Sequence, residues 1–172
     1  MMAPPLEMTP ALDNLTHQPE MTAGEPPRIM VVDDDQGFRE MLRDFLADDG
    51  FDVVGEAPDG VEAVTQADRL KPDVIVMDLR MPRMDGLEAT RRIKDTLPIT
   101  QVVILSAYED PALKRGAERA GVYCYLIKGC SPAMLVDVLR FAWSFKVGLE
   151  QGGAPAREAL EGLNGSEPNS GR

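Results

Sequence analysis

The feature that most constrains the fold of this chain is a run of four apolar residues, Val74–Met77, that no polar residue interrupts. A strand with one solvent-facing side alternates apolar and polar residues, whereas a strand buried on both sides is apolar throughout. Such strands are typical of parallel sheets, in which helices cover both faces. The run therefore favours an α/β architecture, with helices in the segments on either side of it.

Strand and helix patterns alternate along residues 29–149. Besides Val74–Met77, short apolar runs predict strands over residues 29–32, 52–56, 101–105 and 123–127. Apolar residues at helical spacing predict helices over residues 38–46, 61–70, 86–95, 111–120 and 132–148. Five strand–helix units in this order predict a doubly wound parallel sheet between two layers of helices, a three-layer αβα fold.

The two ends of the chain differ in composition from this central part. Residues 1–28 are rich in proline and have no helical or strand period, which predicts a disordered leader. Residues 150–172 are rich in glycine and polar residues, which predicts a mostly disordered tail. We therefore expect one folded domain over residues 29–149.

Charge and composition exclude several function classes. The chain has 29 acidic and 18 basic residues and a net charge of -11, which argues against a nucleic-acid-binding surface or docking on anionic lipid. No apolar run approaches the roughly 18 residues that a membrane span needs, and no secretory signal is recognisable. We expect a cytoplasmic protein without membrane contact.

The cysteines and the histidine offer little chemistry to the folded part. Cys124 and Cys130 are six residues apart and fit no zinc-binding spacing. His17 is the only histidine and lies in the leader. Mechanisms that need a histidine base or a histidine metal ligand are therefore not expected in the domain.

Charged and hydroxyl side chains follow four of the five predicted strands. Three consecutive acids, residues 33–35, follow the first strand, and Asp78 follows the third. Ser106 follows the fourth strand and Lys128 the fifth. In doubly wound sheets, ligands bind beyond the carboxyl ends of the strands, so we expect these side chains around one crevice.

This set of side chains suits phosphoryl transfer. Crowded carboxylates resist ionisation, and a hard cation such as Mg²⁺ relieves their repulsion by binding the oxygens. A lysine and a hydroxyl add donors for the charge that spreads over a transferring phosphoryl group. An aspartate can itself be the nucleophile, and Asp78, after the most buried strand, is the best candidate.

Four motifs resemble the receiver domain of two-component response regulators. They are Val-Val-Asp-Asp at 31–34, Val-Ile-Val-Met-Asp-Leu-Arg-Met-Pro-Arg-Met-Asp-Gly at 74–86, Ile-Leu-Ser-Ala at 104–107 and Tyr-Leu-Ile-Lys at 125–128. The resemblance covers residues 29–149 and implies the flavodoxin-like (βα)5 fold. It also implies that the chain is a signalling switch that catalyses only its own phosphorylation and dephosphorylation.

The resemblance assigns roles to individual residues. It implies that Asp78 accepts a phosphoryl group from a histidine kinase or a phosphotransfer protein, while Lys128 pairs with the phosphoryl oxygens. It further implies that Ser106 and Tyr125 act as the switch. The implied ligands of Mg²⁺ are Asp33, Asp34, Asp78 and the backbone carbonyl of Arg80. Asp35 has no such role and is expected to be a helix cap or a solvated acid.

The length of chain after the domain indicates how the signal is passed on. Only 23 residues follow Leu149, too few for a DNA-binding module of about 50 residues, so we expect signalling by protein contact without nucleic-acid binding. We expect a homodimer or an effector complex through the face that residues 111–120, 123–127 and 132–148 form. Met134, Phe141 and Trp143 lie off the apolar stripe of the last helix, which suggests a partner surface.

Two alternatives stay open. A degenerate receiver would act as a binding module that does not depend on phosphorylation. Residues 33–35 also resemble the Asp-x-Asp motif of haloacid-dehalogenase-type phosphohydrolases, although the usual following threonine or valine and a cap domain are missing. An ATPase and an EF-hand are excluded, because the chain has no phosphate-binding Gly-x-x-x-x-Gly-Lys motif and no complete calcium loop.

Overall fold

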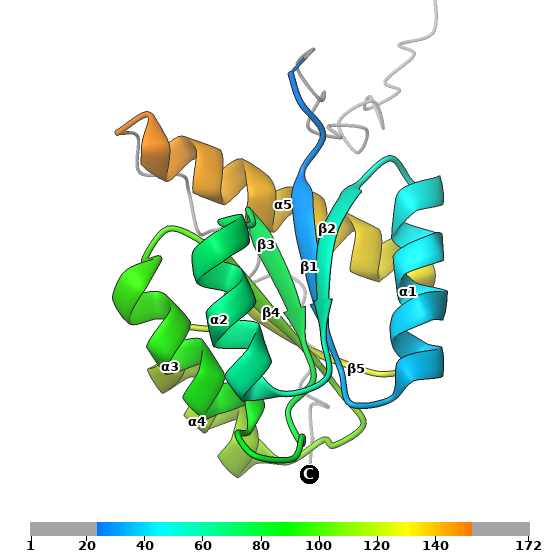
Figure 1. The fold of residues 1–172 in the computed structure, drawn as a ribbon, viewed down its shortest axis with the longest axis vertical. Coiled ribbons are helices and arrows are strands. Elements are labelled where there is room, and N and C mark those ends of the chain that lie inside the picture. The colour runs from blue at the N-terminus through cyan, green and yellow to red at the C-terminus, as the bar shows by residue number, and fades with distance from the viewer. Residues whose placement is uncertain (1–23, 153–172) are drawn as a thin grey trace, which may run out of the picture.

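The computed structural model describes residues 24–152. The predicted leader and tail lie almost wholly outside these residues. Five strands alternate with five helices along the described chain, as the sequence predicts (Figure 1). In chain order they are β1 (Arg28–Val32), α1 (Gln36–Asp48), β2 (Asp52–Ala57), α2 (Gly60–Leu70), β3 (Val74–Met77), α3 (Gly86–Thr96), β4 (Gln101–Ser106), α4 (Pro111–Ala120), β5 (Cys124–Ile127) and α5 (Pro132–Glu150).

The five strands form one parallel sheet in the order β2-β1-β3-β4-β5. Side chains of α1 and α5 pack on one face of this sheet, and those of α2, α3 and α4 pack on the other. Figure 1 shows α5 crossing behind the sheet. The prediction of a doubly wound, three-layer flavodoxin-like fold is therefore confirmed. No helix in the described part of the chain is long and apolar enough to span a membrane.

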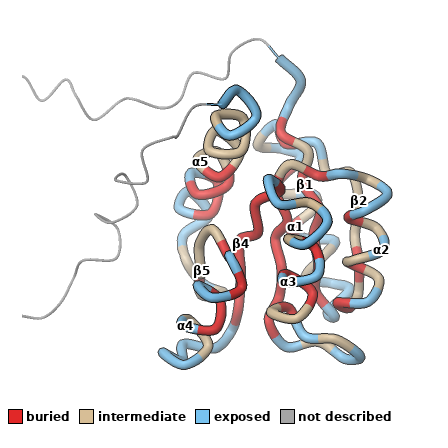
Figure 2. Tube along the Cα trace, turned by 90° about the vertical axis from the view of Figure 1, so that its left-hand side faces the viewer, coloured by how far each residue is buried: buried red, intermediate tan, exposed pale blue. Residues whose placement is uncertain are grey.

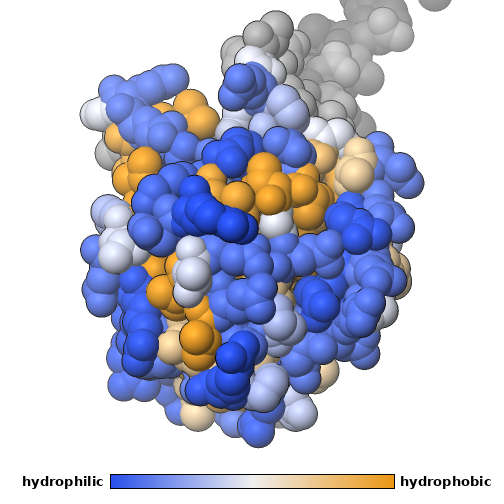
Figure 3. All heavy atoms as spheres, viewed as in Figure 1, coloured by the Kyte–Doolittle hydropathy of each residue, from blue (hydrophilic) through white to orange (hydrophobic). Residues whose placement is uncertain are grey.

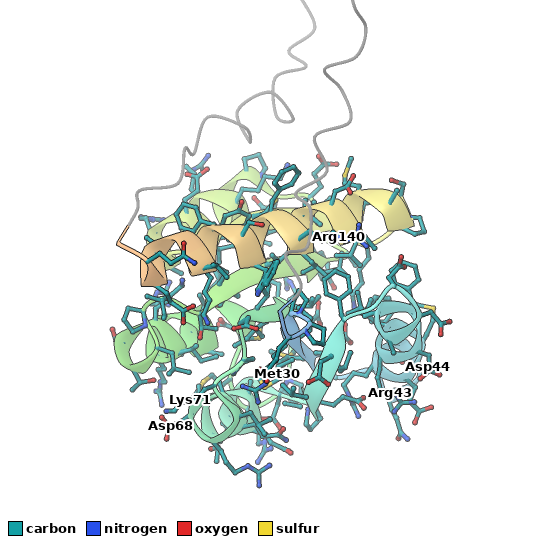
Figure 4. All side chains as sticks on the ribbon, turned by 90° about the horizontal axis from the view of Figure 1, so that it is seen from above. Met30, Arg43, Asp44, Asp68, Lys71 and Arg140 are labelled. Atoms are coloured by element: carbon teal, nitrogen blue, oxygen red, sulfur yellow. The ribbon has the colours of Figure 1, made fainter. Side chains whose placement is uncertain are left out.

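The core lies on both faces of the central strands. All four residues of β3 and all six of β4 are buried, as the uninterrupted apolar run of β3 predicts. In Figure 2 the red of buried residues runs along β4, while pale blue and tan predominate on the outer parts of the molecule. Figure 4 shows Met30 deep between the layers, with the Arg43–Asp44 and Lys71–Asp68 pairs at the outside.

The last helix buries more of its apolar side chains than the sequence indicates. Trp143 packs against the same core cluster as the predicted stripe, and Phe145 contacts the ring of Tyr123 at a centroid distance of 5.5 Å. Phe141 is half-buried, and Met134 keeps 42% of its surface exposed. Figure 3 shows separate apolar patches on a largely hydrophilic face of the molecule. Met134 is therefore the most exposed of the three residues that the sequence places off the stripe.

The loop between β3 and α3 is held against the start of α2. The Asp59 side chain caps α2 by accepting a hydrogen bond from the Glu62 amide at 3.0 Å, and it also accepts one from Nε of Arg83 at 2.9 Å. The Gly60 amide donates to the Met84 carbonyl at 3.2 Å. A Cβ on Gly60 would lie 2.5 Å from that carbonyl oxygen, so only glycine fits there. These contacts fix the loop that follows Asp78.

We expect Asp59→Ala to lower the free energy of unfolding by about 1–2 kcal/mol, because it removes both a helix cap and the partner of Arg83. Urea denaturation measures this loss. Asp110→Ala is the matched control, since Asp110 caps α4 by accepting from the Ala112 amide at 2.7 Å. Equal losses in the two variants would show that the Arg83 contact adds no stability.

The contact between Asp59 and Arg83 should make the free energy of unfolding depend on pH. Burial raises the pKa of Asp59, but the Glu62 amide and the Arg83 guanidinium lower it more, to a net value below the ordinary 3.8. The folded state therefore favours the carboxylate. The advantage of the wild type over Asp59→Ala should be complete above that ordinary pKa and should fade as the pH falls through the lowered value. Urea curves at several acid pH values check this sign.

Candidate functional site

The register of the sheet brings the ends of β1 and β3 together. Val32 pairs with Met77, so the next residues, Asp33 and Asp78, leave neighbouring strands at the same edge. The Asp78 amide donates to the Val32 carbonyl at 2.8 Å, which continues the ladder one residue beyond the strand. Backbone hydrogen bonds thus fix the positions from which both side chains extend.

Three of the predicted acids form a cluster at this edge. One carboxylate oxygen from each of Asp33, Asp34 and Asp78 lies within 4.8 Å of the others. Asp33 and Asp78 are buried, with 2% and 7% of their surface exposed, while Asp34 faces solvent. Oxygen ligands at this spacing, open on one side, could hold a metal ion. Asp35 instead caps α1 by accepting from the Phe38 amide at 2.8 Å.

Lys128 joins the cluster from the end of β5. Its ammonium lies 2.5 Å from Oδ2 of Asp33, 3.6 Å from Oδ1 of Asp78 and 4.3 Å from the centre of the Phe38 ring. Burial lowers the pKa of Lys128, but the hydrogen bond to Asp33 and the charge of Asp78 outweigh burial and raise it overall. The lysine is therefore a fixed positive charge between the two buried carboxylates.

Asp78 is the acid that this environment perturbs most. Burial and the negative charge of Asp33 raise its pKa from 3.8 to about 6, although the charge of Lys128 opposes the rise. One lysine thus balances only part of the charge of three acids. A divalent cation would relieve the remaining repulsion, and the donor set of three carboxylates fits a hard ion.

Ser106 and Tyr125 meet at one residue of the next loop. Ser106 is the last residue of β4 and is fully buried, and its Oγ accepts a hydrogen bond from the Tyr108 amide at 3.1 Å. The Tyr125 hydroxyl donates to the Tyr108 carbonyl at 2.6 Å. The Lys128 amide donates to the Ser106 carbonyl at 2.8 Å, so the ends of β4 and β5 are joined as well.

Arg80 lies in the loop after Asp78, and its side chain is exposed. Its guanidinium carbon lies 4.4 Å from the centre of the Tyr108 ring, so it reaches from the β3–α3 loop to the β4–α4 loop. Together with Asp34, Asp85 and Leu113, Arg80 lines an open hollow beside the acid cluster. This side-chain contact is separate from the role of the Arg80 carbonyl that the resemblance implies.

The structure therefore gathers four predicted residues, Asp33, Asp34, Asp78 and Lys128, into direct contact or close approach. Ser106 and Tyr125 are connected to each other through Tyr108. Sequence reasoning missed Tyr108. Its only signal in the sequence is its place two residues after Ser106, and a tyrosine in a loop has no special spacing.

Comparison with known proteins agrees with this geometry. A family model described as the response regulator receiver domain matches residues 29–140. The transcriptional regulatory protein PdtaR of Mycobacterium tuberculosis is 37% identical over 122 residues, which cover 71% of this chain and 59% of that protein. The chemotaxis protein CheY of Thermotoga maritima is 36% identical over 112 residues, which cover 65% of this chain and 93% of that protein.

A solved structure resembles this chain in both fold and sequence. The response regulator domain of Thermotoga maritima CheB has a TM-score of 0.64 at 34% sequence identity, with coverage of 69% of this chain and 97% of that chain. The chain spans 59% of the length of PdtaR and 31% of a protein-glutamate methylesterase of Myxococcus xanthus to which it is 46% identical over 110 residues. What unites these proteins with this chain is the matched domain. The family model over residues 29–140 and these relatives show that the chain belongs to the response regulator receiver domain family, a family of signalling domains rather than classical enzymes.

Proposed function

We propose that this chain is a phosphorylation-controlled switch of a cytoplasmic two-component system, with residues 29–149 as its receiver unit. Asp78 accepts a phosphoryl group from a histidine kinase or a phosphotransfer protein, and the response passes to other proteins by contact. One observation supports this proposal above the others. A buried carboxylate with a raised pKa, Asp78, lies within 3.6 Å of the ammonium of Lys128 and beside two further acids.

The transfer step needs Asp78 as the nucleophile. A carboxylate oxygen of Asp78 forms a bond to phosphorus, while the bond from phosphorus to the donor, a histidine nitrogen of the kinase, breaks. The donor nitrogen keeps the electron pair of that bond, and the product is an acyl phosphate on Asp78. Lys128 already faces Asp78 and supplies a positive charge for the added oxygens, and the buried hydroxyl of Ser106 is the candidate donor from β4.

Asp33, Asp34 and Asp78 would hold Mg²⁺, and the backbone carbonyl of Arg80 is the further ligand that we propose. When bound, Mg²⁺ neutralises negative charge on the acids and on the phosphoryl oxygens. The chain itself contributes the fixed position of these groups. The β1–β3 register sets Asp33 against Asp78, and the contacts of Asp59 and Gly60 hold the loop that contains Arg80.

The output surface that we propose is the face of α4, β5 and α5. A groove on this face is lined by residues that include Lys114, Tyr125, Met134 and Val138. Tyr125 therefore belongs to this groove and also reaches the loop next to Ser106. A change at Asp78 that alters this loop would change the floor of the groove, which suits a homodimer or an effector protein as partner.

The first test is labelling by a small phosphodonor. We expect acetyl phosphate to label the wild type in the presence of Mg²⁺ and Asp78→Asn to abolish labelling, because an amide cannot form the acyl phosphate. Asp35→Asn is the matched control and should label normally, since Asp35 is only a helix cap. Labelling of Asp78→Asn at the wild-type rate would place the nucleophile elsewhere. A wild type that never labels but still binds partners would be a phosphorylation-independent module.

The second test separates the two donors. We expect Lys128→Ala to slow labelling by about 100-fold, the usual effect of losing one donor that faces transition-state charge. Ser106→Ala should reduce labelling less and should weaken the change on the α4–β5–α5 face more. Labelling rates and the amide spectra of the two variants, with and without beryllofluoride, measure both effects. An unchanged rate in a folded Lys128→Ala protein would contradict the assigned role.

The third test concerns the output face. We expect sedimentation to show more dimer with Mg²⁺ and beryllofluoride than without, and Met134→Glu to prevent this dimer. Glutamate is favoured at the third position of a helix, so the substitution should leave α5 intact. Met41→Glu changes an even more exposed methionine, at 58% exposure, on α1 and should dimerise like the wild type. A wild type that stays monomeric in both states would rule out the homodimer, and the partner at the groove would then be another protein.

A further inference from the structure

Three contacts, from β4, from β5 and from the loop after β3, converge on Tyr108. Its amide donates to Oγ of Ser106 at the end of β4, and its carbonyl accepts from the Tyr125 hydroxyl on β5. Its ring lies under the guanidinium of Arg80, from the loop after β3. Tyr108 is 47% exposed, so the two hydrogen bonds hold its backbone, while Arg80 contacts its ring.

The contact of Arg80 is of a weak kind. A cation over an aromatic ring at an exposed site stabilises the pair only slightly, whereas an arginine bound to a phosphate makes much stronger charge-assisted hydrogen bonds. Arg83, in the same loop, contacts a buried carboxylate, Asp59. The guanidinium of Arg80 instead lies on a ring, beside a hollow that Asp34 also lines.

We propose that Arg80 is a phosphoryl-binding residue that Tyr108 holds in reserve. In the unmodified protein the guanidinium lies on the Tyr108 ring. When Asp78 carries a phosphoryl group, the new negative charge two residues away attracts the guanidinium, and the ring of Tyr108 is released. This inference rests on the proposed function of Asp78 and assigns the Arg80 side chain a role separate from that of its backbone carbonyl.

The release would reach β5 through contacts that already exist. The Ser106 hydroxyl and the Arg80 guanidinium both contact Tyr108 now, and both would turn towards the phosphoryl group. Tyr108 would then lose two of its three contacts at once. The carbonyl that anchors the Tyr125 hydroxyl would move with the freed loop.

Affinity for beryllofluoride, a mimic of the phosphoryl group, tests the competition. With saturating Mg²⁺, we expect Tyr108→Ala to bind it about two- to fivefold more tightly, the factor that corresponds to losing an exposed cation–π contact. Arg80→Ala should bind it more weakly, because the reserved charge is gone. In the Arg80→Ala background, Tyr108→Ala should have no further effect. Tyr108→Phe keeps the ring and Arg115→Ala removes an exposed arginine from α4, so both should behave like the wild type.

A readout in the free protein detects the contact itself. The chain has three tyrosines, so fluorotyrosine labelling gives three ¹⁹F resonances, which Tyr→Phe variants assign. We expect Arg80→Ala to shift the Tyr108 resonance without any ligand. Beryllofluoride should shift that resonance of the wild type in the same direction and should move the Tyr125 resonance as well.

The outcomes separate the two proposals. A wild type that binds no beryllofluoride would overturn the proposed function, and the reserve role of Arg80 with it. A wild type that binds normally, while Tyr108→Ala binds equally or more weakly, would overturn only the reserve role. The same holds if the effects of Tyr108→Ala and Arg80→Ala simply add, or if the Tyr108 resonance of the free protein ignores Arg80.

Discussion

The parallel pairing of β1 with β3 is the constraint on which the rest of the site depends. Because Val32 lies opposite Met77, the two strands end level, and the carboxylates of Asp33 and Asp78 emerge side by side. A slip of one residue would turn Asp78 to the other face of the sheet. Buried apolar side chains on both faces of β3 prevent that slip, so the packing of the core sets the geometry of the acids.

The position of the acids lowers the stability of the folded domain. Burial and mutual repulsion disfavour ionisation, and they raise the pKa of Asp78. Lys128 offsets part of this effect through its contacts with Asp33 and Asp78, which also tie the end of β5 to the ends of β1 and β3. Three carboxylates share one ammonium, so negative charge stays unbalanced, and this is the physical basis for expecting a divalent metal ion there.

Much of this arrangement could be predicted from the sequence. The apolar run of β3 and the alternation of patterns predicted the fold, and the residues that follow β1, β3 and β5 predicted which acids and which lysine meet. The contacts of Tyr108 could not be predicted in this way, and neither could the pairing of Asp59 with Arg83. Periodicity determines which side of an element a residue faces, but these contacts join loops whose path depends on backbone turns, such as the left-handed conformation of Arg83 at φ 66°.

The sheet order has a consequence for how the domain opens locally. Asp78 follows β3, which has a partner strand on each side, whereas Tyr125 belongs to β5, a four-residue edge strand paired only with β4. Amides of a central strand exchange with solvent only when the whole domain unfolds, while an edge strand can open on its own at a smaller cost. Asp78 thus follows a strand with a partner on each side, whereas Tyr125 lies on a strand that can open at a smaller free-energy cost. Because Lys128 directly follows β5 and contacts Asp33 and Asp78, opening of this edge strand is coupled to the charge balance of the acids.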